Sequence, residues 1–348
     1  MKARIVSNQT PVGQRSRLAS ALPLETPYMV QVFPVYACNF KCNYCVFSLP
    51  KAERGYVSDC KYLDFELYLK CIRDIRQFPD KLRMLRFAGT GEPLLHPRIT
   101  DMIAVAAKER VADSIDIVTN GAMLTPELSN KIVEAGVNRI RVSVQGINRE
   151  KYLATTNTYE DFETIVSNIS YLFSIKGNIE LYVKIIDSAL SGKEDENAFY
   201  RTFGDIADLL SIEHLLPATP RIDYSRIAGI ATMNKTQNGA DIATTDICPQ
   251  PFYMLQINPD GVAAPCCGME SPLKLAQLAD TSVAEVWKGK ALNALRRAML
   301  SGCRRKNPVC ADCNQFRFAM FPEDVLDGEN SRLLQLYSDM PSALRRPA

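Results

Sequence analysis

The chain has 348 residues, of which 47% are hydrophobic, and its 41 basic side chains nearly balance 39 acidic ones. This length and apolar content suffice for one large domain and a smaller one. The balance of charge leaves little net field to attract DNA, RNA or an anionic membrane. No apolar run is long enough to predict a membrane-spanning helix, and residues 1–27 lack the apolar core of a secretory signal. We therefore expect a cytoplasmic protein with a small-molecule substrate and with no nucleic-acid or membrane partner.

Apolar segments typical of β-strands alternate with helical patterns, which predicts βα units around a parallel sheet. The segments are 30–35, 84–88, 114–119, 139–144, 179–186 and 214–218. The expected fold class is α/β, a partial (β/α)6 barrel resembling the TIM barrel, with a small C-terminal β-hairpin and helix domain. In such a barrel the functional loops lie at the carboxyl ends of the strands.

Cys38, Cys42 and Cys45 follow the first predicted strand in a CX3CX2C arrangement. Three soft thiolates on one short loop can hold three irons of a cubane cluster and leave the fourth iron open to a small molecule. Buried core cysteines would not be expected beside the polar residues of this loop. A structural zinc site usually has CX2C or CX4C pairs. The spacing favours an iron-sulfur cluster over both alternatives.

Two helices are predicted between the strands, one from the spacing of its apolar residues and one from the residues at its ends. Apolar side chains recur at helical spacing from 63 to 78, which places Cys71 in the core rather than in a metal site. Thr125 is a predicted N-cap, Pro126 a first-turn residue and Gly136 a C-terminal stop.

The segment 221–246 has no clear period and predicts a connection between two domains. After it, two strand-like runs flank a turn at 258–261, which predicts a hairpin that brings Cys266 back toward Cys248. Ser282 begins a capping-box pattern ahead of a helical stretch in which Trp287 is expected to be a packing anchor.

The first half of the chain resembles the radical S-adenosylmethionine (SAM) enzymes. Tyr44 provides the aromatic residue before the third cysteine of their signature, and Gly89-Thr90-Gly91-Glu92-Pro93 is similar to their GGEP motif after the second strand. The resemblance implies that SAM chelates the open iron and is cleaved to a 5'-deoxyadenosyl radical, which removes a hydrogen atom from the substrate.

The resemblance also implies which residues contact SAM. Gly89, Gly91 and Glu92 would contact the methionine amino group, and Ser143 and Gln145 the ribose. Lys184 could pair with the SAM carboxylate, or could be a lysine at the solvated end of a strand.

The second half resembles the auxiliary-cluster domains called SPASM and twitch. Cys248, the GX4C element ending at Cys266, and the CX2C pair Cys310 and Cys313 are similar to the ligands of one auxiliary [4Fe-4S] cluster. Cys267 or Cys303 could replace one of them, and structural zinc is the alternative metal.

An auxiliary cluster whose irons all carry protein thiolates is expected to accept or relay an electron. By analogy with twitch relatives that modify aminocyclitols, the expected reaction oxidises a carbinol of a sugar, aminocyclitol or polyol to a ketone, with a one-electron reductant such as flavodoxin or ferredoxin as partner. The alternatives are epimerisation with a cysteine as hydrogen donor, peptide or protein modification like that of sulfatase maturases, and a redox sensor without turnover. The weak candidate hydrogen donors are Cys267, Cys303 and Cys60.

No catalytic acid or base is assigned, because His96 and His214 both lie where structural histidines are common. The expected domain organisation is an N-terminal extension (1–27), the barrel (28–220), the connecting segment (221–246), the auxiliary-cluster domain (247–320) and a C-terminal tail (321–348).

Overall fold

The computed structural model describes residues 1–6, 15–227, 229 and 233–339. Within these residues, ten strands form one sheet in the order β1-β7-β6-β5-β4-β3-β2-β8-β9-β10. In this order, each pair of neighbours from β1 through β2 to β8 is parallel. The last two pairs, β8 with β9 and β9 with β10, are antiparallel. The strands are Arg4–Ile5 (β1), Met29–Val32 (β2), Met84–Phe87 (β3), Ile115–Thr119 (β4), Arg139–Val144 (β5), Glu180–Ile186 (β6), Leu209–Glu213 (β7), Met254–Ile257 (β8), Val262–Ala264 (β9) and Ala276–Gln277 (β10).

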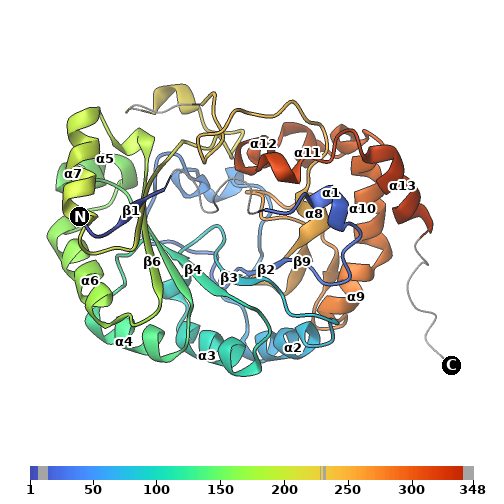
Figure 1. Ribbon diagram of the computed structural model, residues 1–348, viewed down its shortest axis with the longest axis horizontal. Helices are drawn as coiled ribbons and strands as arrows, with labels where there is room; N and C mark the ends of the chain where they lie inside the picture. Colours follow the sequence, from blue (N-terminus) through green and yellow to red (C-terminus); the bar gives the residue numbers. More distant parts are fainter. Residues whose placement is uncertain (7–14, 228, 230–232, 340–348) are drawn as a thin grey trace.

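Helices cover the outer face of the sheet, with α2, α3, α4 and α6 in a curved layer around the strands (Figure 1). Apolar side chains from strands and helices form one large core between these layers. The helices are Leu18–Ala21 (α1), Phe65–Ile75 (α2), Ile99–Glu109 (α3), Pro126–Glu134 (α4), Arg149–Thr156 (α5), Phe162–Ile175 (α6), Lys193–Phe203 (α7), Gln250–Tyr253 (α8), Val283–Lys288 (α9), Lys290–Leu300 (α10), Pro308–Asp312 (α11), Gln315–Ala319 (α12) and Asn330–Asp339 (α13). None of the helices described is long and apolar enough to cross a membrane.

The α/β partial barrel expected from the sequence is confirmed, and several local signals act as expected. The Thr125 hydroxyl accepts a hydrogen bond from the backbone of the first turn of α4, and Gly136 follows that helix with a φ of +87°. Cys71 is fully buried in the core. Ser282 completes a capping box at α9. Trp287 is buried, and its indole N–H donates to the Leu24 carbonyl.

The prediction of a sixth strand at 214–218 is wrong, because the strand is β7, Leu209–Glu213. The apolar alternation begins earlier than the prediction had it, and the predicted segment contains Pro217, which has no N–H to donate to a ladder. His214 therefore lies just past the carboxyl end of β7, where its backbone N–H donates to the Gln237 carbonyl.

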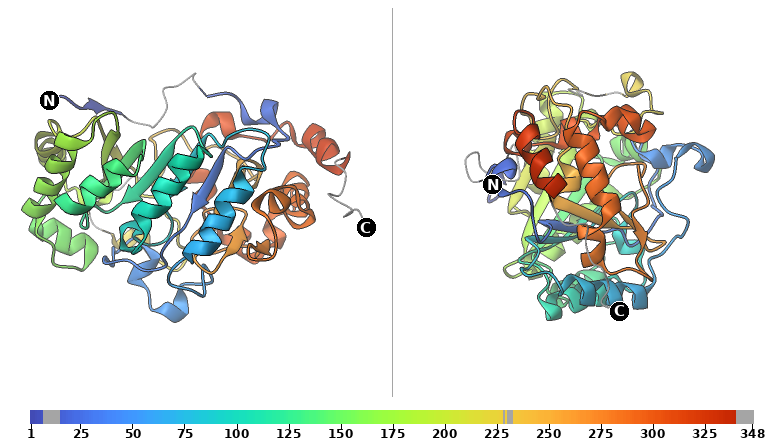
Figure 2. Two further views of the ribbon diagram at one scale, coloured as in Figure 1. Left: turned by 90° about the horizontal axis from the view of Figure 1, so that it is seen from below. Right: turned by 90° about the vertical axis from the view of Figure 1, so that its right-hand side faces the viewer.

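The sheet extends beyond the predicted barrel at both edges. At one edge β1 pairs with β7, and at the other β8 pairs in parallel with β2, so the C-terminal hairpin continues the barrel sheet. Figure 2 shows β1 at one end of the molecule and α13 at the other, with the sheet running between them.

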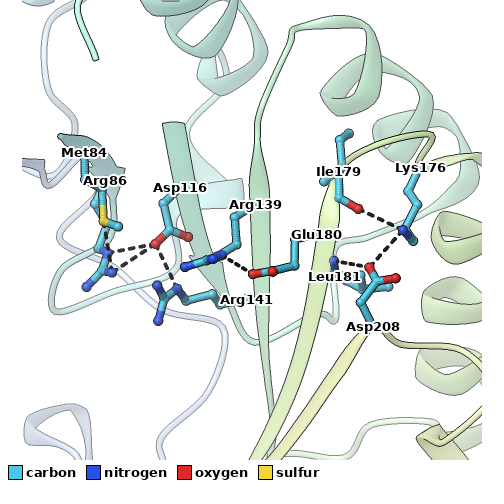
Figure 3. Close-up of polar contacts among 10 residues, drawn as sticks. All are labelled: Met84, Arg86, Asp116, Arg139, Arg141, Lys176, Ile179, Glu180, Leu181 and Asp208. Atoms are coloured by element: carbon cyan, nitrogen blue, oxygen red, sulfur yellow. Dashed lines mark hydrogen bonds and ion pairs between the residues drawn. The ribbon is translucent and has the colours of Figure 1, made fainter. Parts of the chain in front are cut away.

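Charged side chains fill the inner face of the barrel near the amino ends of its strands (Figure 3). Asp116 Oδ2 accepts from Arg86 Nη2 at 2.9 Å and from Arg141 Nε at 2.8 Å, and Arg139 pairs with Glu180 on the next strand. Asp116 is fully buried, and the Arg141 side chain is 2% exposed. These ion pairs occupy the amino-terminal part of the interior.

Substituting Asp116→Asn should remove the one negative charge shared by Arg86 and Arg141. Removing one partner of a buried ion pair leaves uncompensated charge, so we expect a loss of about 3 kcal/mol. The measurement is the urea midpoint followed by circular dichroism on anaerobically purified protein. Asp113→Asn, at an exposed position, is the matched control. Equal midpoints for the two variants would contradict this account.

Candidate functional site

A cavity of about 230 Å3, here called the barrel cavity, lies at the carboxyl ends of β5, β6 and β7 beside the cysteine loop. Four of the predicted SAM contacts line it: Tyr44, Ser143, Gln145 and Lys184. Further lining residues that the sequence did not single out for this site are Glu213, His214, Thr219, Gln237 and Met269.

Hydrogen bonds order the wall of the barrel cavity. The Tyr44 hydroxyl donates to Gln145 Oε1 at 2.6 Å, which links the cysteine loop to the end of β5. Lys184 Nζ lies 2.6 Å from Glu213 Oε2, so the lysine that was expected to bind the SAM carboxylate has a carboxylate partner of its own. Gln237 Nε2 donates to the same Glu213 oxygen at 2.6 Å.

The segment 89–93 packs against the cysteine loop rather than lining the barrel cavity. A Cβ at Gly91 would lie 2.2 Å from the Val35 carbonyl oxygen, so only glycine fits there. Glu92 is buried and accepts from the Leu94 and Asn120 backbones and from the Thr119 hydroxyl. Burial raises the pKa of Glu92 to about 7, although these hydrogen bonds favour its ionised form. The carboxylate joins the ends of β3 and β4.

The three thiols of the cysteine loop are close enough to interact electrostatically. Burial raises the pKa of Cys38 to about 12, and it also raises the pKa of Cys42 and of Cys45. The Phe40 N–H donates to Cys38 Sγ at 3.4 Å. Buried thiols of this kind lose their protons when a metal supplies compensating positive charge.

A second cavity of about 300 Å3, here called the auxiliary cavity, collects four cysteines from three separate segments. They are Cys248, Cys266, Cys310 and Cys313, the four thiols expected to hold the auxiliary cluster. A Cβ at Gly268 would lie 3.6 Å from Cys266 Sγ, so this glycine keeps space open beside the sulfur. Arg304 lines the same cavity and is buried.

The remaining cysteines lie elsewhere. Cys267 lies outside the auxiliary cavity lining, with Sγ 3.6 Å from Gln250 Oε1. Cys303 Sγ lies near the Ser301 carbonyl, and Cys60 is exposed. None of these three lines either cavity.

The two cavities adjoin, because Ala218, Thr219 and Met269 line both. The donor sets fit iron-sulfur clusters, since each cavity is bordered by soft thiols in a buried setting. No group of three or more described His, Cys, Asp or Glu side chains is arranged to hold a single metal ion. The cluster ligands therefore remain predictions.

Several lining residues escaped the sequence analysis because they carry no motif. Glu213 lay just outside the misplaced sixth strand, His214 was interpreted as a structural histidine at its start, and Thr219 lies in the loop after it. The pairing of His214 with Asp187 joins the ends of β6 and β7, and no sequence pattern relates two loops 27 residues apart. The signal that could have identified these lining residues is the position of polar side chains directly after a barrel strand.

Family comparisons agree with this arrangement of fold and thiols. Residues 32–187 match the model of the radical SAM superfamily. Residues 248–314 match that of SPASM, an iron-sulfur cluster-binding domain. The chain therefore carries a radical SAM domain followed by a SPASM domain. The first domain implies a [4Fe-4S] cluster and SAM, and the second implies auxiliary iron-sulfur clusters.

Sequence relatives match over part of their length. The tungsten-containing aldehyde ferredoxin oxidoreductase cofactor-modifying protein of Pyrococcus furiosus is 28% identical over 53% of this chain and 50% of its own. GTP 3',8-cyclase of Chlorobaculum tepidum is 30% identical over 42% of this chain and 41% of its own. The chain thus spans half or less of these relatives.

Solved structures share the fold. BtrN in complex with AdoMet and 2-DOIA superposes with a TM-score of 0.55 at 16% identity, covering 82% of this chain and 92% of BtrN. Streptococcus suis SuiB bound to its precursor peptide SuiA gives 0.59 at 13% identity, covering 86% of this chain and 72% of SuiB.

Substituting Gly91→Ala should push a methyl group into the Val35 carbonyl and separate the 89–93 segment from the cysteine loop. Overpacking of this kind costs about 1–3 kcal/mol. Gly192→Ala is the matched control, because Gly192 has a φ of +153° against +159° for Gly91 but no atom within 4 Å of its Cβ position. The thermal midpoint should fall further in G91A than in G192A, and equal shifts would leave backbone conformation as the whole cause.

Proposed function

We propose that this radical SAM enzyme is an oxidoreductase that oxidises a carbinol carbon of a sugar, aminocyclitol or similar polyol to a ketone. The observation that carries the proposal is the contact between the two cavities through Ala218, Thr219 and Met269. Cys45 lines the first cavity, and four cysteines line the second. A substrate held at this junction faces the SAM side and the auxiliary side at once. That placement suits a reaction in which a hydrogen atom leaves in one direction and an electron in the other.

The chain's own cysteines are proposed to hold both clusters. Cys38, Cys42 and Cys45 would hold the first, and the second would be held by Cys248, Cys266, Cys310 and Cys313. When bound, the first cluster and SAM supply a 5'-deoxyadenosyl radical, and the auxiliary cluster supplies an electron acceptor. A one-electron reductant such as flavodoxin or ferredoxin is the proposed partner.

The protein's polar residues would orient SAM and exclude water. The hydrogen bond between Tyr44 and Gln145 joins the cysteine loop to the end of β5. Ser143 lies on β5, two residues before Gln145. Lys184 is held by Glu213 and can present its ammonium group to the SAM carboxylate while keeping that partner. Glu92 positions the 89–93 segment through its three hydrogen bonds.

A small-molecule substrate is supported by the likeness to BtrN, which was solved in complex with AdoMet and 2-DOIA. Peptide modification is the second candidate, supported by the likeness to SuiB with its precursor peptide. Epimerisation receives less support, because the candidate hydrogen donors Cys267, Cys303 and Cys60 lie outside both cavities.

The reconstituted protein, reduced with dithionite, should convert SAM to 5'-deoxyadenosine. With myo-inositol, 2-deoxystreptamine or UDP-glucose as probe, dehydrogenation should lower the mass of the product by about two units, because two hydrogens leave. Mass spectrometry measures both products. No 5'-deoxyadenosine from fully reconstituted protein would contradict the enzyme proposal, and conversion without a mass change would favour epimerisation.

Substituting a cysteine of one set should remove the iron of that set and leave the iron of the other set in place. We expect roughly eight irons per chain, four for each cubane, and a fall to about four in either Cys42→Ala or Cys310→Ala. Only Cys42→Ala should abolish SAM cleavage outright. Cys60→Ala is the matched control, because its thiol is exposed and lines neither cavity. Full iron content in Cys310→Ala would remove Cys310 from the auxiliary ligand set.

A further inference from the structure

The segment that follows β7 places an unpaired hydroxyl at the junction of the two cavities. Thr219 is 3% exposed, and its N–H donates to the Tyr224 hydroxyl at 3.0 Å. By hydrogen-bond geometry its own Oγ1 has no partner among the described residues. Thr219 lines both cavities. A buried hydroxyl without a partner costs free energy, so a ligand that hydrogen bonds to it is favoured at this point.

The same segment begins with a histidine that is held by an aspartate. His214 lines the barrel cavity, and its Nδ1 lies 3.1 Å from Asp187 Oδ2. Asp187 Oδ1 accepts from the Leu215 N–H at 2.9 Å, so the carboxylate is fixed by the same loop. An acceptor at Nδ1 requires the proton on that nitrogen in the neutral ring, which leaves the Nε2 lone pair free to take a proton.

His96, the other histidine of the chain, has the opposite arrangement. Its Nδ1 accepts from the Arg98 N–H, so its Nε2 carries the proton and donates to the Leu63 carbonyl at 2.9 Å. Burial lowers the pKa of His96, which keeps the ring neutral and structural. His96 has both nitrogens occupied, whereas Nε2 of His214 makes no hydrogen bond to a described residue.

Space is kept beside that nitrogen. A Cβ at Gly239 would lie 3.5 Å from His214 Nε2, so the glycine backbone leaves the imidazole edge uncovered by a side chain. Gly239 has a φ of +83°, which favours glycine in the turn that faces His214.

The acidic neighbour in the cavity is already engaged. Glu213 Oε2 accepts from Lys184 and from Gln237, each at 2.6 Å, and Oε1 lies 3.5 Å from the Tyr182 hydroxyl. Both carboxylate oxygens of Glu213 already face protein groups. His214 is therefore the better placed base of the barrel cavity.

We propose that the reacting hydroxyl of the substrate binds to the segment after β7, where Thr219 Oγ1 positions it and His214 Nε2, oriented by Asp187, accepts its proton. The assignment rests on the proposed function. His214 Nε2 takes the O–H proton as the C=O bond forms. Bound SAM would supply the radical that takes the carbinol C–H hydrogen atom, and a bound iron-sulfur cluster would supply the acceptor for the remaining electron.

The first test measures the chemical reactivity of the two histidines in the absence of turnover. Diethyl pyrocarbonate acylates an imidazole nitrogen that has a free lone pair, and peptide mass spectrometry locates the product on the reconstituted protein. His214 should be modified and His96 should not, because both His96 nitrogens are hydrogen bonded. Saturating SAM together with myo-inositol should slow the modification of His214. An unreactive His214, or modification of His96 alone, would overturn the proposal.

The second test separates proton transfer from hydrogen abstraction. The holoenzyme receives ring-deuterated myo-inositol or 2-deoxystreptamine, and deuterium in 5'-deoxyadenosine is followed beside ketone formation. In His214→Gln, ketone formation should fall by about 100-fold or more, while deuterium transfer continues. Asp187→Asn should show the same split to a smaller degree, because it disturbs the orientation of the ring. Equal ketone formation in wild type and His214→Gln would overturn the assignment.

Thr219 is tested by removing only its hydroxyl. Thr219→Val, which is close in shape, should raise KM for the probe by up to about tenfold, the effect of losing one neutral hydrogen bond. Thr219→Ser should restore KM. An unchanged KM in the valine variant would overturn the role of Thr219. Wild-type protein that makes no 5'-deoxyadenosine would instead contradict the proposed function, so the two failures are distinguishable.

Discussion

The parallel pairing of β2 with β8 is the constraint on which the rest of the molecule depends. β2 leads directly into the cysteine loop, and β8 belongs to the hairpin that carries Cys266. Met29 pairs with Met254 and Val32 with Ile257, so main-chain hydrogen bonds join segments 225 residues apart in the chain. Inside the barrel, Gln31 donates to Gln256 at 2.7 Å. The cysteine loop and the hairpin that carries Cys266 are therefore connected through a continuous sheet and not only through a linker.

A second connection supports this pairing from the cysteine-loop side. The Tyr56 hydroxyl donates to Asp260 Oδ2 at 2.6 Å, and the Asp59 N–H donates to the same oxygen at 3.1 Å. Asp260 lies in the hairpin turn, so the chain that leaves the cysteine loop returns to hold the turn of the auxiliary domain. Both contacts join the segment after the cysteine loop to the hairpin turn, in addition to the pairing of β2 with β8.

Local signals in the sequence predicted more than long-range ones. The strand 139–144 and the caps of α4 follow from alternation and from a hydroxyl before a proline, both of which act over a few residues. The resemblance to SPASM domains pointed to Cys248, Cys266, Cys310 and Cys313, and the structure brings these four to one cavity. Pairing of β8 with β2 could not be predicted, because a short apolar strand carries no information about which edge it joins. The partner of Lys184 was missed for a related reason, since Glu213 lay outside the predicted sixth strand.

The two ends of the barrel interior are filled differently. Near the amino ends of the strands, Asp116 takes hydrogen bonds from two arginines, and the ion pairs close the interior. Toward the carboxyl ends, Thr219 Oγ1 and Gln315 Oε1 are buried without a partner among the described residues, and both belong to cavity walls. Asp116 Oδ1, at the closed end, also has no partner among the described residues, but Thr219 differs from it in lining two cavities where a ligand can complete its hydrogen bonds. The segment after β7 is therefore where binding free energy is still to be gained, and a polar substrate gains more there than an apolar one.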